Sequence, residues 1–406
     1  MSKKKIITIS VILLILTNIV TFGLTNILSL QFNNKVIVPK KEYAEISSVL
    51  EEYSKILLLE SIIEEDYLRD VDQDKFIEGQ FKGVVQSLED PYSQYLTEKE
   101  YKSLSEETSG SFGGIGVIVT PGDDNLITVV SPIEDTPGER AGIRSGDKII
   151  KVDGEEYSAE EMDEAVEVMK GEPNTDVSLT IMRRDNNVNE MIDMDITREK
   201  IRLETVKSNI IDDNIGYIKL TSFDELTYDD FKKALEELEN SNVEGLLIDL
   251  RNNPGGLLDS TADIANELLD KGDIVYTEDK NGKREYLKSD ESHTELPLVV
   301  LVNEGSASAS EILAGAIQDH NRGEIIGTTT FGKGVVQRIK PLSDGSAIKL
   351  TISEYFTPNG TSIHGIGVKP DIEVELNEDV EVIGVENLNE DNQLKEAMDV
   401  LKEKIK

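Results

Sequence analysis

The chain has 406 residues, and its 80 Asp and Glu against 42 Lys and Arg give a formal net charge of −38. This length exceeds one hydrophobic core, so we expect two or three folded units, and the acidic balance argues against nucleic acid as a partner, because phosphate binding requires clustered Lys and Arg. The absence of cysteine excludes thiol catalysis, cysteine metal ligands and disulfides, and we expect neither a metal site nor a cofactor.

The amino-terminal segment predicts a membrane anchor. Three lysines, residues 3–5, precede a stretch without charged residues that is apolar from Ile6 to about Leu30. As a helix, this stretch could cross a bilayer of about 30 Å at ~1.5 Å per residue, and the lysines should remain cytoplasmic. We therefore expect a cytoplasmic stub and single transmembrane anchor in residues 1–34, with the remainder extracytoplasmic. A cleaved signal peptide is the competing interpretation, although no alanine precedes Ala44; a buried core helix is a third.

Residues 41–107 have the pattern of amphipathic helices. The turn 89–91 separates most of this segment from residues 92–96. Such a helical arm could pack on the core or on a second subunit, and the sequence does not choose between them. Apolar residues recur at three- and four-residue intervals among Glu and Lys: Ile46, Val49, Leu50, Tyr53, Ile56, Leu57, Ile62 and Ile63.

Residues 108–198 predict a small β domain with one prominent helix. The helix is expected from Ala159 to Lys170 and should end at Gly171, a residue type suited to the position after a helix. Alternating apolar residues and turn residues predict the strands: 115–119, 126–130, 148–152, and a final pair, 177–183 and 189–197, around a turn at 185–187.

From residue 199 to 375, strands and helices alternate, which predicts an α/β core with a partly parallel sheet. The tail, residues 376–406, is acidic and ends in a short helix from Leu394 to Ile405. Strands are expected at 215–220, 243–250 and 296–302, and helices at 228–240 and 257–270. A third helix is expected to begin within residues 306–311 and to end near His320.

Two loops that follow buried strands, 252–256 and 303–310, have the position of an active site in an open α/β sheet. Ser308 would stand at a helix start, where free N–H groups and the helix dipole can stabilise an oxyanion. Its S-x-x-E spacing to Glu311 also fits a helix capping box, which is the structural alternative. The loop is not a G-x-S-x-G elbow, because serines occupy the glycine positions.

A serine nucleophile needs a base. His320 closes the helix that Ser308 opens, about 18 Å away at ~1.5 Å per residue, and is too far. Lys333 lies in a glycine-flanked turn before a strand expected at 335–339, and burial can lower a lysine pKa from ~10.4 by up to ~3–5 units. On an extended chain Gln337 would point to the same side as Lys333 and could fix its amine. A solvated turn lysine is the alternative.

Six segments in order across residues 45–375 together resemble the carboxyl-terminal processing peptidases, tail-specific serine peptidases with an internal PDZ domain. The resemblance implies a crotonase/Clp-like α/β peptidase core, an inserted small β PDZ domain and helical terminal arms. The segments are DPYSQYL (90–96), GGIGV (113–117), AGIRSGDKI (141–149), IDLRNNPGG (248–256), SASASE (306–311) and TFGKGVVQ (330–337).

The resemblance also assigns site residues. The nucleophile falls on Ser308, the general base on Lys333 and the lysine-positioning amide on Gln337. The oxyanion N–H groups fall on Ala309 and on one glycine of the pair 255–256, with Gly256 preferred over Gly255. The carboxylate-binding loop of the PDZ domain falls on four consecutive residues: Gly114, Ile115, Gly116 and Val117.

The sequence thus predicts a serine endopeptidase that binds carboxyl-terminal segments of extracytoplasmic proteins in its PDZ groove as an added strand. The resemblance suggests that this binding gates the active site, with activation or inhibition left open. It also suggests a homodimer through the terminal helices. Two alternatives remain: a membrane-anchored PDZ scaffold without catalysis, and another acyl-group enzyme on a crotonase-like core.

Overall fold

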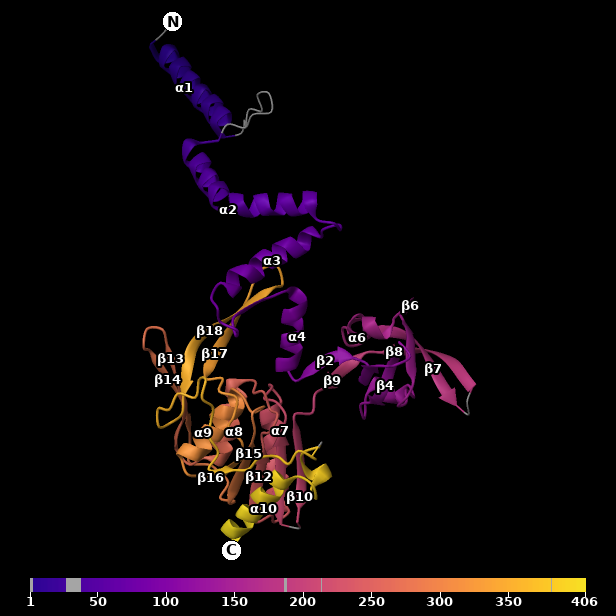
Figure 1. Ribbon diagram of the computed structural model, residues 1–406. Coiled ribbons are helices and arrows are strands. Elements are labelled where there is room, and N and C mark those ends of the chain that lie inside the picture. The colour runs from indigo at the N-terminus through magenta and orange to yellow at the C-terminus, as the bar shows by residue number, and fades with distance from the viewer. Residues whose placement is uncertain (1–2, 27–37, 186–187, 213, 381) are drawn as a thin grey trace. The chain divides into compact units, whose positions relative to one another are not determined.

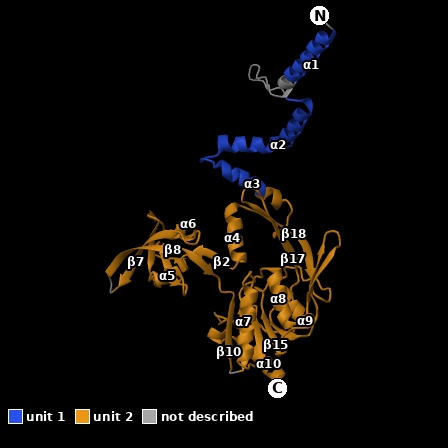
Figure 2. Cartoon of the chain, turned by 180° about the vertical axis from the view of Figure 1, so that it is seen from behind, with its two compact units in different colours: residues 1–81 blue, residues 82–406 orange. Residues whose placement is uncertain are grey.

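The computed structural model describes residues 3–26, 38–185, 188–212, 214–380 and 382–406. The chain divides into two compact units, residues 1–81 and 82–406, which are coloured separately in Figure 2. Figure 1 labels most of the helices and strands, which are numbered in chain order. Residues 27–34 of the predicted anchor and residues 186–187 of the predicted turn lie outside the described residues.

The first unit is helical. Helix α1 (Lys3–Asn26) contains a stretch of 19 residues, Lys3–Thr21, with a mean hydropathy of 1.8 and no buried residue. By length and composition this stretch could cross a bilayer, and a signal sequence near the amino terminus would look the same. Helix α2 (Lys40–Asp66) also has no buried residue, so its predicted apolar stripe is largely exposed. The boundary between the units falls within α3 (Gln73–Gln86).

A small β domain occupies residues 111–202 of the second unit. Strands β2 (Ser111–Gly114) and β9 (Glu199–Arg202) pair where the chain enters and leaves it. The other strands form one sheet in the order β3-β4-β5-β7-β8, with β6 beside β5. These strands are β3 (Val117–Pro121), β4 (Ile127–Pro132), β5 (Lys148–Val152), β6 (Glu155–Glu156), β7 (Asp176–Asp185) and β8 (Val188–Thr197); a short helix is α5 (Pro137–Arg140).

Two predictions for this domain were wrong in detail. The strand expected at 115–119 is interrupted, because Gly116 has a φ of +73°, and β3 begins only at Val117. The helix expected from Ala159 to Lys170 is a 3-10 turn, Ala159–Glu161, followed by α6 (Met162–Met169). Lys170 already has extended backbone angles, so the helix ends before Gly171 is reached.

The α/β core contains a six-stranded sheet in the order β10-β11-β12-β15-β16-β19. All neighbouring strands are parallel except β10, which is antiparallel to β11. This bears out the partly parallel sheet expected from the alternating strands and helices. The strands are β10 (Val206–Ile211), β11 (Ile215–Leu220), β12 (Gly245–Asp249), β15 (Leu298–Val302), β16 (Gly323–Gly327) and β19 (Ile372–Glu373).

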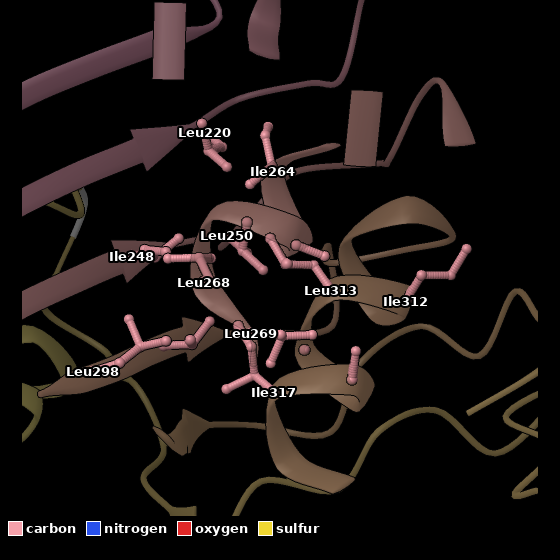
Figure 3. Packing of buried hydrophobic residues seen from close by; sticks show 14 of the residues in the cluster. Leu220, Ile248, Leu250, Ile264, Leu268, Leu269, Leu298, Ile312, Leu313 and Ile317 are labelled. Atoms are coloured by element: carbon pink, nitrogen blue, oxygen red, sulfur yellow. The ribbon is translucent and has the colours of Figure 1, made fainter. Parts of the chain in front are cut away.

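Helices cover both faces of this sheet, because successive residues of one strand point to opposite sides. In β12, Leu246 and Ile248 pack with residues of α7 (Thr227–Asn240), α8 (Leu258–Leu268) and α9 (Ala309–Asp319). Leu247, between them, packs with α10 (Asn392–Ile405). Figure 3 shows the first of these clusters, in which Ile248 and Leu298 of the sheet meet Ile264, Leu268 and Leu313 of the helices. The near-continuous apolar runs of β12 and β15 follow from this double burial.

A second sheet in the core is antiparallel. Its order is β1-β18-β13-β14, with β17 also paired to β18. Helix α4 (Glu98–Thr108) follows β1 and begins with a capping box between Thr97 and Glu100. The strands are β1 (Gln94–Leu96), β13 (Gly272–Asp279), β14 (Arg284–Ser289), β17 (Val335–Pro341) and β18 (Ala347–Phe356). The sequence predicted only β17 among these.

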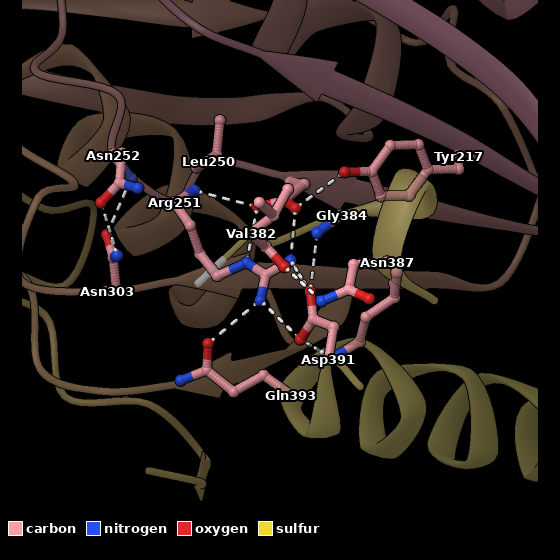
Figure 4. Close-up of polar contacts among 12 residues, drawn as sticks. Tyr217, Leu250, Arg251, Asn252, Asn303, Val382, Gly384, Asn387, Asp391 and Gln393 are labelled. Carbon is pink, nitrogen blue, oxygen red and sulfur yellow. Dashed lines mark hydrogen bonds and ion pairs between the residues drawn. The ribbon is translucent and has the colours of Figure 1, made fainter. Parts of the chain in front are cut away.

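A fully buried ion network fastens the carboxyl-terminal segment to the end of β12 (Figure 4). Arg251 Nη2 lies 2.6 Å from Asp249 and 2.8 Å from Asp391, which caps α10. Arg251 Nη1 also donates to Gln393 at 3.1 Å. Burial alone would raise the pKa of Asp391, but the hydrogen bonds and charge of Arg251 outweigh it and hold that pKa below its usual value.

We predict that Arg251→Ala lowers the free energy of unfolding by about 3–5 kcal/mol, because two buried carboxylates lose their counter-charge. Urea unfolding of the full chain in detergent, followed by circular dichroism, measures this change. Lys233→Ala is the matched control: its pair with Glu237 is 75% and 64% exposed, and its loss should cost at most about 0.5 kcal/mol. Equal effects of the two substitutions would contradict the prediction.

Candidate active site

The candidate site lies where two neighbouring parallel strands of the core end. The loops after β12 and β15 are joined by hydrogen bonds between Asn252 and Asn303, from the Asn252 N–H at 2.8 Å and from the Asn303 amide at 2.8 Å (Figure 4). The carboxyl ends of adjacent parallel strands meet at one edge of the sheet, which is where the sequence predicted a site. The two loops therefore form one surface.

Contacts distinguish the three serines of the second loop. Ser306 and Ser310 are buried, and their hydroxyls donate to the carbonyls of Leu250 at 2.8 Å and Asn253 at 2.9 Å. Ser308 instead lines a cavity of about 330 Å³. Its φ of +54° is uncommon for a residue with a side chain and is typical of strained positions at functional sites.

A buried carboxylate, Glu311, joins the start of α9 to the turn that carries Lys333. Its Oε2 accepts the backbone N–H of Ser308 at 2.8 Å and that of Lys333 at 2.9 Å. Its Oε1 accepts the N–H of Gly332 at 2.7 Å and the hydroxyl of Thr330 at 2.5 Å. Of the capping box expected from the S-x-x-E spacing, the bond from the Ser308 N–H to the Glu311 carboxylate is formed, whereas the Glu311 N–H donates to the Ser308 backbone carbonyl at 2.9 Å. The capping alternative is therefore compatible with a chemical role for Ser308.

Two backbone N–H groups in the cavity wall could polarise a carbonyl oxygen. The N–H of Gly255 is occupied, because it donates to Asn253 Oδ1 at 2.9 Å. Among the described residues, the N–H groups of Gly256 and Ala309 have no acceptor, the latter because the first residue of a helix has none within the helix. Glycine is required at 256, since a Cβ would lie 2.0 Å from the Phe223 carbonyl oxygen at a φ of +148°. This geometry favours Gly256 over Gly255 as a donor.

Lys333 lines the same cavity, half-buried. Its Nζ lies 5.2 Å from the ring centroid of Tyr92. Burial lowers the pKa of Lys333, the positive charge of Lys349 lowers it further, and Glu311 opposes both. A lowered pKa is the property that a lysine needs to act as a base near neutral pH.

Gln337 lines the cavity too, but it does not contact the lysine amine. Its Nε2 donates to the Val335 carbonyl at 3.2 Å. Lys333, Val335 and Gln337 all line the cavity, as expected for residues on one side of an extended chain, but the Gln337 amide is bonded to its own strand and not to the amine. Within the described ranges, no hydrogen bond joins the Lys333 amine to Ser308 or to Gln337.

Sequence reasoning missed residues that β18 and α9 bring to the site. Tyr355, which is buried, donates its hydroxyl to the Ser308 carbonyl at 3.0 Å. Lys349 lines the cavity. The S-x-x-E spacing identified Glu311 as a capping partner, but nothing local indicated its bonds to residues 330–333. No group of three or more His, Asp or Glu in the described part of the chain could hold a metal ion.

The four residues expected to bind a carboxylate lie at the junction of β2 and β3. Gly114 ends β2, Ile115 and Gly116 form the turn, and Val117 begins β3. The Gly116 carbonyl is occupied by the N–H of Ile133 at 2.9 Å and the hydroxyl of Thr136 at 3.0 Å. A Cβ on Gly114 would lie 3.8 Å from the Cα of Lys170, so this loop lies beside the end of α6.

Comparison with protein families gives three matches. Residues 214–374 match the model for peptidase family S41, and residues 128–183 match the PDZ domain. Residues 14–100 match the amino-terminal domain of the activating protease CtpB. The candidate site falls within the first of these segments, since it comprises the loops around residues 256, 308 and 333.

Relatives align over most of the chain. The carboxy-terminal processing protease CtpA of Bacillus subtilis is 42% identical over 316 residues, 77% of this chain and 67% of its own length. A carboxy-terminal-processing protease of Bartonella bacilliformis is 44% identical over 316 residues, 76% of this chain and 72% of its own. A crystal structure described as an S41 protease of Bacteroides fragilis has a TM-score of 0.52 at 18% identity, over 84% of this chain and 96% of that one, and shows the shared fold.

We predict that Glu311→Gln destabilises the protein by roughly 2–6 kcal/mol, because the amide nitrogen cannot accept the two backbone N–H groups that Oε2 now binds. Urea unfolding followed by tyrosine fluorescence measures the change. Glu304→Gln is the matched control in the same loop: its carboxylate is exposed and accepts one hydroxyl, that of Thr328. An unfolding midpoint for Glu311→Gln equal to that of the control would contradict the role assigned to this carboxylate.

Proposed function

The chain belongs to peptidase family S41, the carboxy-terminal processing serine proteases, and we propose that it hydrolyses peptide bonds with a dyad of Ser308 and Lys333. The family, the α/β fold with an inserted PDZ domain, and the serine-peptidase activity expected from the sequence are confirmed by the family matches and the relatives. The observation that supports the dyad is that Glu311 binds both the Ser308 N–H and the Lys333 N–H, beside one cavity.

In the proposed reaction, the Ser308 hydroxyl attacks the carbonyl carbon of the scissile bond while the neutral Lys333 amine takes its proton. The N–H groups of Gly256 and Ala309 stabilise the oxyanion that develops. The Lys333 ammonium then returns the proton to the leaving amine, and the acyl-enzyme forms. Water, deprotonated by the same lysine, hydrolyses the ester and releases Ser308.

The proposed reaction requires a local rearrangement of the lysine turn. The Lys333 amine faces the Tyr92 ring and the Gln337 amide is bonded to Val335. For catalysis the lysine side chain must turn toward Ser308, and the Gln337 amide must leave its strand carbonyl to hold the amine. Catalytic hydrogen bonds that are absent in a free enzyme commonly form only with bound substrate.

We propose that the PDZ domain binds the carboxyl-terminal segment of extracytoplasmic protein substrates in the groove between β3 and α6, and that this binding gates the dyad. A contact that supports gating is the ion pair of Lys170, next to α6, with Glu106 of α4 at 3.3 Å. Leu104 and Glu107 of α4 line the cavity that Ser308 and Lys333 also line. If Lys170→Ala leaves the dependence of turnover on added carboxyl-terminal peptide unchanged, this route for gating is wrong.

The proposed location is the cell membrane, with α1 as a single-pass anchor and the peptidase outside. The apolar stretch Lys3–Thr21 supports it by length and composition. Fractionation of cells that express the full chain tests this proposal. Recovery of the uncleaved chain in the soluble fraction would contradict an anchor, and a chain shortened at its amino terminus would indicate a signal peptide.

We also propose a homodimer formed through the terminal helices. Helix α2 carries the supporting observation, because its apolar residues are exposed along the helix and none is buried within the described chain. Light scattering of the detergent-solubilised chain distinguishes a monomer from a dimer. A monomer at concentrations up to about 100 µM, where an interface of micromolar affinity would be saturated, would contradict the proposal.

We predict that Ser308→Ala and Lys333→Ala each lower kcat/KM for an unstructured peptide by at least about 10³-fold, because each removes a member of one proton-transfer unit. Peptide binding, measured by fluorescence anisotropy, should remain within about threefold of the native value, since neither residue belongs to the PDZ loop. Lys340→Ala, on the exposed side of β17, is the control. Cleavage by Ser308→Ala at the native rate would exclude the dyad.

The pH dependence of kcat/KM should have an acid limb set by Lys333. Its pKa is lowered in the folded protein, so the amine is neutral and active above that value. As the pH falls through it, the amine protonates and the rate should drop about tenfold per pH unit. Initial rates between pH 5 and 9 test this expectation, and a flat profile over that range would contradict the lysine base.

A further inference from the structure

The cavity that Ser308 and Lys333 line contains a second lysine. Lys349 of β18 lines the same cavity as Lys333. Its backbone position is fixed from both sides, because Lys349 is opposite Gln94 of β1 and opposite Ile339 of β17. Ile339 lines the cavity as well, and cross-strand partners share one face of a sheet. Strand register, and not a loop, therefore presents Lys349 to the site.

The charges around Lys333 leave Lys349 without a counter-charge in direct contact. Glu311 binds four donors at 2.5–2.9 Å. Glu107 of α4 and the phenol of Tyr355 also line the cavity, and Tyr92 presents its ring to the Lys333 amine. In the described chain, neither an ion pair nor a side-chain hydrogen bond is formed by Lys349.

Two ammonium groups in one partly dehydrated cavity repel each other. The repulsion is relieved when one of the two amines is neutral. Lys333 is the amine that loses its proton. Its burial already disfavours the charged form, and the positive charge of Lys349 acts in the same direction. Glu311 opposes the effect without cancelling it.

We propose that Lys349 is a positioning residue for catalysis, whose fixed positive charge keeps the neighbouring Lys333 amine unprotonated and so available as the base. This role rests on the proposed Ser308–Lys333 mechanism. Lys349 itself neither touches the scissile bond nor transfers a proton. Its contribution is electrostatic, so it depends on the charge at position 349 and is weakened by salt.

The first test is the acid limb of kcat/KM against pH for Lys349→Met, Lys349→Glu and Lys349→Arg in the full chain. Loss of the charge in Lys349→Met should move the acid limb to higher pH by about one unit. At a fixed pH on the limb, this shift lowers kcat/KM about tenfold. Lys349→Glu should move the limb further in the same direction. Lys349→Arg should leave the limb in place. The matched control is Lys340→Met. Lys340 of β17 pairs with Ile348, the residue before Lys349 in β18, so Lys340 points to the face of the sheet opposite to that of Lys349.

A limb that stays in place in Lys349→Met and Lys349→Glu overturns the proposal. Such a result with a raised KM at every pH would mean that Lys349 binds the substrate instead. A shift of equal size in Lys340→Met would also overturn it, since that shift would reflect net charge and not position.

The second test does not use turnover. In the Ser308→Ala background, the rate at which acetic anhydride acylates the Lys333 amine is followed against pH by mass spectrometry, with and without Lys349→Met. The midpoint for Lys333 should rise by about one pH unit when the charge is removed. An unchanged midpoint overturns the proposal whether or not the peptidase is active. A raised midpoint, together with no peptidase activity in the chain that retains Ser308, would leave the coupling of the two lysines intact and refute the dyad alone.

Discussion

The buried carboxylate of Glu311 holds together two segments that the chain delivers separately. One oxygen binds the backbone of Ser308 and Lys333, and the other binds residues 330 and 332. A charged acceptor bound by several N–H groups makes strong hydrogen bonds, and removal of any of them leaves a buried polar group without a partner. The distance between the backbones of Ser308 and Lys333 is thus set by their shared bonds to this carboxylate.

The rest of the core supports this arrangement. Parallel strands covered by helices on both faces end at a common edge, and the loops after β12 and β15 are fastened to each other there. Arg251 extends the support, because the residue that begins the first loop is also bonded to the cap of α10. The last helix of the chain therefore supports the first loop, although none of its residues lines the cavity.

The antiparallel sheet contributes a polar and a charged side chain to the site. Strand β18 brings Tyr355 against the Ser308 carbonyl and Lys349 into the cavity with Lys333. The cavity thereby combines dehydration of Lys333 with a second positive charge, and both conditions favour a neutral amine. Helix α4 closes the cavity with Leu104 and Glu107, and its neighbour Glu106 contacts the PDZ domain through Lys170. Helix α4 thus contacts both the cavity and the PDZ domain.

The sequence alone determined the elements whose pattern is local: β11, β12, β15 and the helices α7 to α10, because buried parallel strands are continuously apolar and amphipathic helices repeat at a fixed spacing. It also indicated Ser308 and Lys333, through motif order. It did not reveal β13, β14 or β18, which are antiparallel and only partly buried. The contacts of Glu311 and Tyr355, and the place of Lys349 in the cavity, were decided only by the tertiary structure. Each brings together residues whose proximity depends on strand register or chain reversal, which leaves no periodic trace in the sequence.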